Sequence, residues 1–246
     1  MIQTASGATM NSGVSYESLE MIEMMENNGP ADLGVSDFFQ KPTGAEAPFK
    51  AMASTNSIVY ILLPLLFFIG TADFTSGAAK NTLASGVSRG KYYASKLILS
   101  CVSCALLLLA YVLFSTLAAT IISGFGGTLD GAFLSEVAKV FFSQLWLCLA
   151  IACVGNFFVF LMRSAAVIGV FIALLIGPST LIMLLTFVDK WFMKLFDYEL
   201  TMGVGALAKI SSMPAGDITR TLLVGAGYLI AAVFGGLALF KKAEIK

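Results

Sequence analysis

The sequence predicts an all-α membrane protein, a polytopic bundle of five transmembrane helices with one short cytoplasmic helix. Of its 246 residues, 58% are hydrophobic and only 12% are charged, whereas soluble domains carry about twice that charge. The apolar residues also gather in five runs, each close to the roughly 20 residues that cross a hydrocarbon core. These runs are residues 53–72, 97–122, 140–162, 165–188 and 222–240.

The first 52 residues differ from the rest and are expected to form an acidic extracellular segment. Residues 1–50 hold seven acids against two lysines. Ser15 could cap a short helix that Gly29 and Pro30 would end. The start of the chain has none of the basic and apolar pattern of a signal peptide. Residues 53–240 form the predicted transmembrane domain, and residues 241–246 a basic cytoplasmic tail.

The spans contain few polar interruptions. Pro64 in the first run is tolerable in a membrane helix, because neighbours can satisfy the freed carbonyl. Gly177 and Pro178 predict a kink or an unwound turn in the fourth run. Gln144 and Asn156 are the strongly polar side chains within the spans, and such groups more often join helices by hydrogen bonds than mark a substrate path.

In the fifth run, small residues recur every four positions, a spacing that lets helix backbones approach closely. Gly227, Ala231 and Gly235 form this stripe. It could pack within the same subunit or against a second copy, and the sequence leaves both open.

The orientation follows from the distribution of Lys and Arg between the spans. The side that contains residues 72–96 and the carboxyl-terminal tail holds eight bases and two acids, and the other side holds seven bases and thirteen acids. We therefore expect residues 72–96 and the tail to be cytoplasmic and the amino-terminal segment to be outside. An outside amino terminus without a signal sequence, followed by five spans, suggests that a further span once preceded Met1.

Several classes of function are disfavoured. The chain has no histidine, which removes His-based catalysis and most zinc sites. Zero net charge argues against nucleic-acid binding. Cys101 and Cys104 form a C-x-x-C, interpreted as two small apolar residues on one face of a buried helix. Asp197 and Glu199 are interpreted as part of a solvated loop, so no catalytic residue and no metal site are expected.

The polar, basic segment 72–96 is the most informative part of the chain. Asp73 or Thr75 could cap a short helix over residues 78–84, which Gly86 would end in a left-handed conformation. Ser88 would then cap a second helix that begins at Arg89 and continues into the second span. The segment predicts a short helix along the membrane surface, joined by a tight turn to a spanning helix. An ordinary amphipathic connector is the competing interpretation.

A nucleotide site in this segment is excluded by its spacing. A phosphate loop needs four residues between its glycines and a Ser or Thr after its lysine. Gly86 and Gly90 are separated by three residues, and Tyr92 follows Lys91. The chain is therefore not expected to be an enzyme or to bind ATP itself.

The run from Gly70 to Ile98 resembles permease subunits of ABC transporters of the type-2 exporter class. The resemblance is greatest to those of Gram-positive bacteria that export, or confer resistance to, peptides and antibiotics. Ala78 stands where that pattern usually has Thr. The matching residues are Asp73, Phe74, Gly77, Lys80, Asn81, Leu83, Gly86, Ser88, Arg89, Tyr93, Ser95, Lys96 and Leu97.

The resemblance implies that the short helix is a coupling helix, seated in a groove of a separate ATP-binding subunit. ATP and Mg would be bound by that subunit, and a second permease half would complete the transporter in a bacterial plasma membrane. Apolar spans suit an amphipathic or lipophilic cargo. The contact residues implied on this chain are Lys80, Asn81, Thr82, Leu83, Ser85, Gly86, Ser88 and Arg89.

The number of predicted spans and the residues within them bear on the alternative functions. Permeases of this class usually have six spans with the amino terminus inside, and this chain predicts five. A non-transporting membrane partner, such as an immunity or sensor subunit, is the alternative function. A secondary transporter would be expected to have ionisable residues within its spans or inverted repeats, and the sequence has neither.

Overall fold

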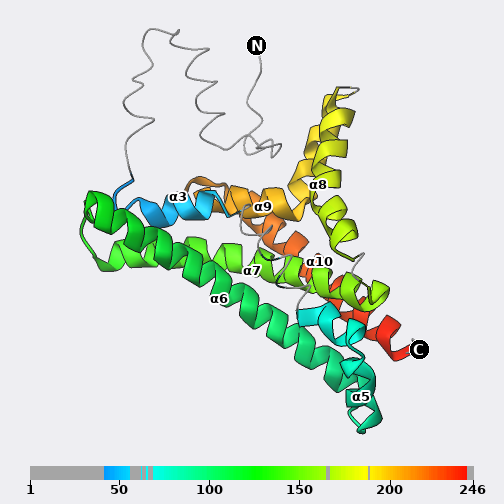
Figure 1. Ribbon diagram of the computed structural model, residues 1–246. Coiled ribbons are helices and arrows are strands. Elements are labelled where there is room, and N and C mark those ends of the chain that lie inside the picture. Colours follow the sequence, from blue (N-terminus) through cyan, green and yellow to red (C-terminus); the bar gives the residue numbers. More distant parts are fainter. Residues whose placement is uncertain are drawn as a thin grey trace.

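The computed structural model describes residues 42–55, 62, 65, 69–164, 167–187 and 189–242. Within these ranges the secondary structure is helical, with turns and no strand. Three helices are long and apolar enough to cross a membrane: α6 (Arg89–Ser123), α7 (Gly131–Met162) and α10 (Ala215–Lys242). The chain therefore has the architecture of an all-helical protein with three candidate membrane-spanning helices (Figure 1).

The three candidate spans contain three of the five predicted runs, and each helix begins earlier than its run. The predicted run 53–72 lies mostly outside the described residues. The run 165–188 corresponds to α8 (Val167–Thr186), a continuous helix of 20 residues with Pro178 inside it. Of the two predicted alternatives at Gly177 and Pro178, the unwound turn is wrong, because the helix continues through both residues, and the kink stays a prediction.

The central bundle consists of α6, α7 and α10, with α7 packed against the other two. In Figure 1, α6 and α7 run side by side, whereas α8 projects away from them. The main core cluster draws on α6, α7 and the segments at one end of the bundle. Close packing needs small residues there: a Cβ at Gly225 of α10 would meet the side chains of Leu147 and Trp146 of α7.

Gln144 joins three helices in this core. Its side chain is fully buried, and its amide nitrogen donates to the carbonyls of Met52 (2.8 Å) and Val204 (2.9 Å). The Thr55 hydroxyl donates to its amide oxygen (2.9 Å). Met52 belongs to α3 (Ala47–Ala53) and Val204 to α9 (Leu200–Ala206). The prediction that a polar side chain here joins helices is confirmed for Gln144.

The connection between α6 and α7 is a glycine turn at one end of the bundle. Gly124 and Gly126 have φ of 76° and 69°, a conformation that glycine adopts without steric cost. The backbone amides of Gly44 and Ala45 donate to the carbonyls of residues 124 and 125. Asp130 then caps α7 through the Phe133 amide (2.8 Å).

Residues 190–198 and 200–212 are helical, whereas the sequence predicted a solvated loop around Asp197 and Glu199. They form η1 (Lys190–Tyr198), α9 and η2 (Leu207–Ser212), and Leu207 is fully buried. Asp197 forms an ion pair with Arg220 (3.1 Å), whereas Glu199 accepts hydrogen bonds from the hydroxyls of Ser179 and Thr201. The two acids thus have separate partners, and the interpretation of this pair as solvated is wrong for Glu199.

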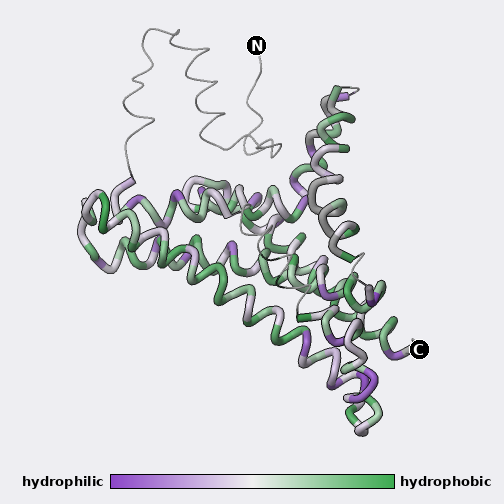
Figure 2. The backbone as a smooth tube through the Cα atoms, in the orientation of Figure 1, coloured by the Kyte–Doolittle hydropathy of each residue, from purple (hydrophilic) through white to green (hydrophobic). Residues whose placement is uncertain are grey.

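The surface is strongly apolar along α6. Figure 2 shows mostly hydrophobic residues along the middle of this helix and hydrophilic residues gathered near its start, beside α5. Phe114 and Ile121 are 70% and 83% exposed. Lipid contact would account for such exposure, because soluble monomers rarely leave so long an apolar face open to water.

Candidate functional site

The candidate site is the segment that leads into α6. Residues 69–75 are helical, α5 covers Ala78–Ala84, and α6 begins at Arg89. Residues 69–96 are referred to below as the elbow. The predicted short helix over residues 78–84 is confirmed, and Figure 1 places α5 beside the start of α6, beyond the main bundle.

Two glycines allow the elbow to turn. Gly77, just before α5, has a φ of 75°, and Gly86, just after it, has a φ of 94°. Side chains other than glycine are strained in that left-handed region. The predicted left-handed turn at Gly86 is therefore confirmed, and the second turn at Gly77 isolates α5 from the preceding helix.

The starts of α5 and α6 are capped differently. Ser88 accepts a hydrogen bond from the Lys91 amide (3.4 Å), as predicted for the start of α6. The predicted cap of α5 by Asp73 or Thr75 is wrong. Gly77, which has no side chain to cap with, occupies the cap position of α5. Asp73 is engaged elsewhere, and the Thr75 hydroxyl donates to backbone carbonyls, so neither residue caps the helix.

Asp73 connects the two helices that flank α5. Its carboxylate accepts hydrogen bonds from Lys96 (2.7 Å) and from the Tyr92 hydroxyl (2.9 Å). Lys96 also donates to the carbonyl of Ile69 (3.0 Å). Burial raises the pKa of the Asp73 carboxyl, but the hydrogen bonds from Lys96 and Tyr92 and the charge of Lys96 outweigh it, so this pKa lies below its usual value. The network fixes residues 69–75 against the start of α6.

An aromatic cluster lies next to this network. Phe160 of α7 is central to it, with ring centroids 4.9 Å from Tyr93 and 4.8 Å from Phe240. Phe74 packs edge-on against Phe160 at 5.4 Å. Edge-to-face pairs at these separations stabilise a core beyond the apolar area that they bury. The cluster joins the elbow to α7 and to the end of α10.

The elbow also contacts α10 directly. Arg89 donates to the carbonyl of Lys241 (3.1 Å), and the Tyr93 hydroxyl donates to the carbonyl of Ala232 (3.3 Å). A Cβ at Gly236 would overlap the Tyr93 ring, so only glycine leaves room for this approach. A displacement of the start of α6 would therefore act on α10 as well.

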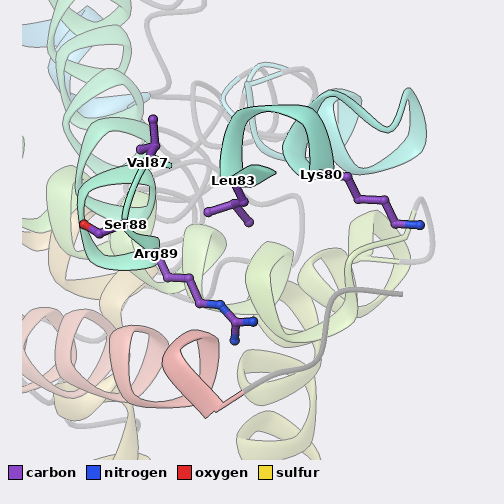
Figure 3. A pocket seen from close by; sticks show the side chains of 5 residues that line it. All are labelled: Lys80, Leu83, Val87, Ser88 and Arg89. Carbon is purple, nitrogen blue, oxygen red and sulfur yellow. The ribbon is translucent and has the colours of Figure 1, made fainter. Parts of the chain in front are cut away.

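The opposite side of the elbow is open. Lys80, Leu83, Val87, Ser88 and Arg89 surround a hollow of about 370 Å³ (Figure 3). In this view Arg89 extends toward the end of α10, and Leu83 points from α5 into the space beside α6. Lys80, Ser88 and Arg89 contribute polar groups to the lining of the hollow, and Leu83 and Val87 contribute apolar ones. In Figure 3 the Lys80 side chain extends away from Leu83 and Arg89.

The predicted contact residues all belong to this region, and they differ in exposure. Thr82, Leu83 and Arg89 are half-buried, and the Thr82 hydroxyl donates to the carbonyl of Ala78 (2.9 Å). The Ser85 hydroxyl donates to the carbonyl of Thr82 (2.8 Å). The exposed members of the predicted set are Lys80, Asn81, Ser85, Gly86 and Ser88.

The predicted packing stripe on α10 is mostly outward-facing. Gly227 and Ala231 are both exposed, and a Cβ at Gly227 would meet nothing within 4 Å. A Cβ at Gly235 would approach Phe157 of α7 at 3.3 Å. The structure thus gives Gly235 a close neighbour in the same chain and leaves open space beside Gly227.

The sequence alone did not identify the network that anchors the elbow. Asp73 and Lys96 border two apolar runs and have opposite charges, and that arrangement is the signal that could have suggested a pair. Nothing in the sequence connects Phe160, Phe240 or the carbonyl of Lys241 with this region.

Comparisons with protein-family models, with curated proteins and with solved structures gave no match to the chain. Within the described residues, no group of three or more His, Cys, Asp or Glu side chains could hold a metal ion.

Proposed function

We propose that this chain is the membrane-spanning permease subunit of an ATP-driven ABC exporter, with the elbow as the contact for a separate ATP-binding subunit. The observation that carries this proposal is the combination of an open, basic hollow on α5 with a closely packed attachment to three helices. The resemblance of residues 70–98 to type-2 permeases supports the same function.

The proposal needs a rigid attachment, because force on a loosely tethered helix would be lost. The ion pair of Asp73 with Lys96 is mostly shielded, with side chains 28% and 17% exposed. The Arg89 bond to Lys241 and the Phe160 cluster extend the attachment to α10 and α7. ATP-driven movement of the partner would in this way tilt α6, α7 and α10 together.

The hollow also suggests the chemistry of the partner surface. Lys80 and Arg89 would favour carboxylates, and Leu83 and Val87 would favour an apolar side chain between them. In the proposed assembly, residues 53–72 and 165–188 supply two further spans and a second permease half faces this one. The membrane is a bacterial plasma membrane, with the elbow inside and the amino-terminal segment outside. The cargo is an amphipathic or lipophilic molecule.

The first test is whether an adjacent gene encodes an ATP-binding subunit, and the second is co-purification of the full chain with that subunit. Lys80→Glu is the best variant, because the Lys80 side chain is exposed, whereas Leu83 packs against the aromatic cluster and Arg89 holds α10. Charge reversal should weaken association about tenfold, which corresponds to about 1.4 kcal/mol, and should lower the ATP turnover stimulated by the permease.

Lys139→Glu is the matched control, since Lys139 is also exposed but belongs to the first turns of α7. It should leave association unchanged. Equal association of the wild type and of Lys80→Glu would contradict the docking role. Association that never alters ATP turnover would favour the non-transporting partner instead.

A further inference from the structure

All four cysteines of the chain meet at one interface, although they come from two helices. The sulfur atoms of Cys101 in α6 and Cys153 in α7 are 4.0 Å apart. Cys104, one turn further along α6, lies in the same buried cluster as Cys148 of α7. All four are free thiols. The fold therefore places two facing thiol pairs across the contact of α6 and α7.

The two pairs differ in access. Cys104, Cys148 and Cys153 are at most 3% exposed, whereas Cys101 is half-buried. The neighbours of Cys101 on α6 are open apolar side chains, with Ile98 62% exposed and Val102 49% exposed. Cys101 lies about 18 Å from the first residue of α6, at 1.5 Å per residue. An apolar reagent dissolved in lipid can therefore reach Cys101, while Cys104 and Cys148 are covered.

We propose that Cys101 and Cys153 are an oxidation site at which a quinone-class oxidant forms a reversible disulfide between α6 and α7. The two S–H bonds break and one S–S bond forms. The two electrons and two protons pass to the quinone, which becomes a quinol. To form the bond, the sulfur atoms must close from 4.0 Å to the disulfide separation of about 2.05 Å.

The disulfide would fix the start of α6 against α7. Cys101 is five residues beyond Lys96, so the cross-link would lie just above the network that anchors the elbow. This site is independent of transport, because its formation requires only the geometry of α6 and α7. If the chain is a permease, the oxidised form would resist relative movement of these helices.

The experiment uses the full chain in lipid nanodiscs and duroquinone as the oxidant. Duroquinone is apolar, and its fully substituted ring does not add thiols. After oxidation, the protein is unfolded, its remaining thiols are alkylated, and the peptides are identified by mass spectrometry. The number of alkylated thiols should fall from four to two, with one linked peptide that contains Cys101 and Cys153. Dithiothreitol should restore all four.

Two variants sharpen the result. Cys101→Ser should keep its remaining three thiols free and should form no linked peptide, whereas Cys104→Ser on the same helix should still form it. Four unchanged thiols in the wild type, a link between Cys104 and Cys148, or a disulfide between two chains would each overturn the proposal. The wild-type measurement decides the matter even if a variant folds poorly.

Discussion

At the scale of single residues, two acids at helix junctions show opposite effects of their surroundings. Asp73 meets a lysine and a tyrosine, which stabilise its charge and lower its pKa. Glu199 is half-buried, and its carboxylate accepts hydrogen bonds from the hydroxyls of Ser179 and Thr201. Burial raises the pKa of the Glu199 carboxyl more than these two hydrogen bonds lower it. The surroundings of the carboxyl group thus favour its ionised form in the elbow and disfavour that form at the other junction.

Glu199→Gln should therefore remove a pH dependence of stability. The folded chain holds the Glu199 proton to a higher pH than the unfolded chain does. The stabilisation from this proton is fully present below the ordinary pKa of 4.5 and is lost as the pH rises through the raised pKa. Its size is about 1.4 kcal/mol for every pH unit that separates the folded and unfolded pKa values. Thermal unfolding in detergent between pH 4.5 and 8 should show a smaller decline for the variant.

The control for this experiment is Glu136→Gln, which changes an exposed carboxyl at the start of α7 in the same way. Its unfolding profile should follow the wild type at every pH. Identical profiles for wild type and Glu199→Gln would show that Glu199 ionises as freely in the folded chain as in the unfolded one.

At the scale of elements, α5 depends on its two turns more than on its own sequence. It has seven residues and no side-chain cap, and helices this short are unstable in isolation. Its position is fixed by Gly77 and Gly86 and by contacts of Ala79 and Leu83 with the aromatic cluster. Changes at the turns should therefore affect α5 without disturbing the long helices.

Gly86→Ala is the corresponding prediction. A Cβ there has open space, so the cost comes from the backbone alone, with a φ of 94°. The free energy of unfolding should fall by about 1–2 kcal/mol, or α5 should lose its position and become sensitive to protease. Gly216→Ala in the first turn of α10 also has open space but no left-handed φ, so it should be neutral or slightly stabilising. Equal effects of the two changes would exclude backbone strain as the cause.

Elements were predictable from the sequence where local chemistry determines them. The bounds of α5, the turn at Gly86 and the cap at Ser88 follow from residue preferences at helix ends. The partner of Asp73 was not predictable from the sequence, because this side chain can either cap the nearby helix α5 or pair with the more distant Lys96. Only the folded chain selects between these two interactions. The helices over residues 190–198 and 200–212 depend on tertiary contacts, because η1 packs against α8 whereas α9 and η2 pack against α7.

At the scale of the whole molecule, the length of α6 separates the two ends of the helix bundle. Its 35 residues extend about 52 Å at 1.5 Å per residue, which exceeds a hydrocarbon core of about 30 Å. Its ends therefore project beyond the apolar layer. The elbow and the end of α10 lie at one end of α6, and α3 with the glycine turn lies at the other (Figure 1).

This arrangement gives a test of the proposed orientation. Lys80→Cys and Lys139→Cys place single new thiols near opposite ends of the bundle, both at exposed positions. A membrane-impermeant maleimide should label Lys139→Cys on intact cells and Lys80→Cys only after lysis. The unaltered chain is the blank, because its own cysteines lie in the apolar interface. Labelling of Lys80→Cys on intact cells would invert the proposed topology.

The bond from Arg89 to the Lys241 carbonyl has a practical consequence for anyone who purifies or images this protein. An affinity handle or a fluorescent protein attached directly after Lys242 would lie close to Arg89, which borders the hollow. It would sterically obstruct the surface where the ATP-binding subunit is proposed to dock. Such a fusion is expected to weaken the proposed docking while the helices remain folded, so markers are better inserted near the glycine turn at the far end.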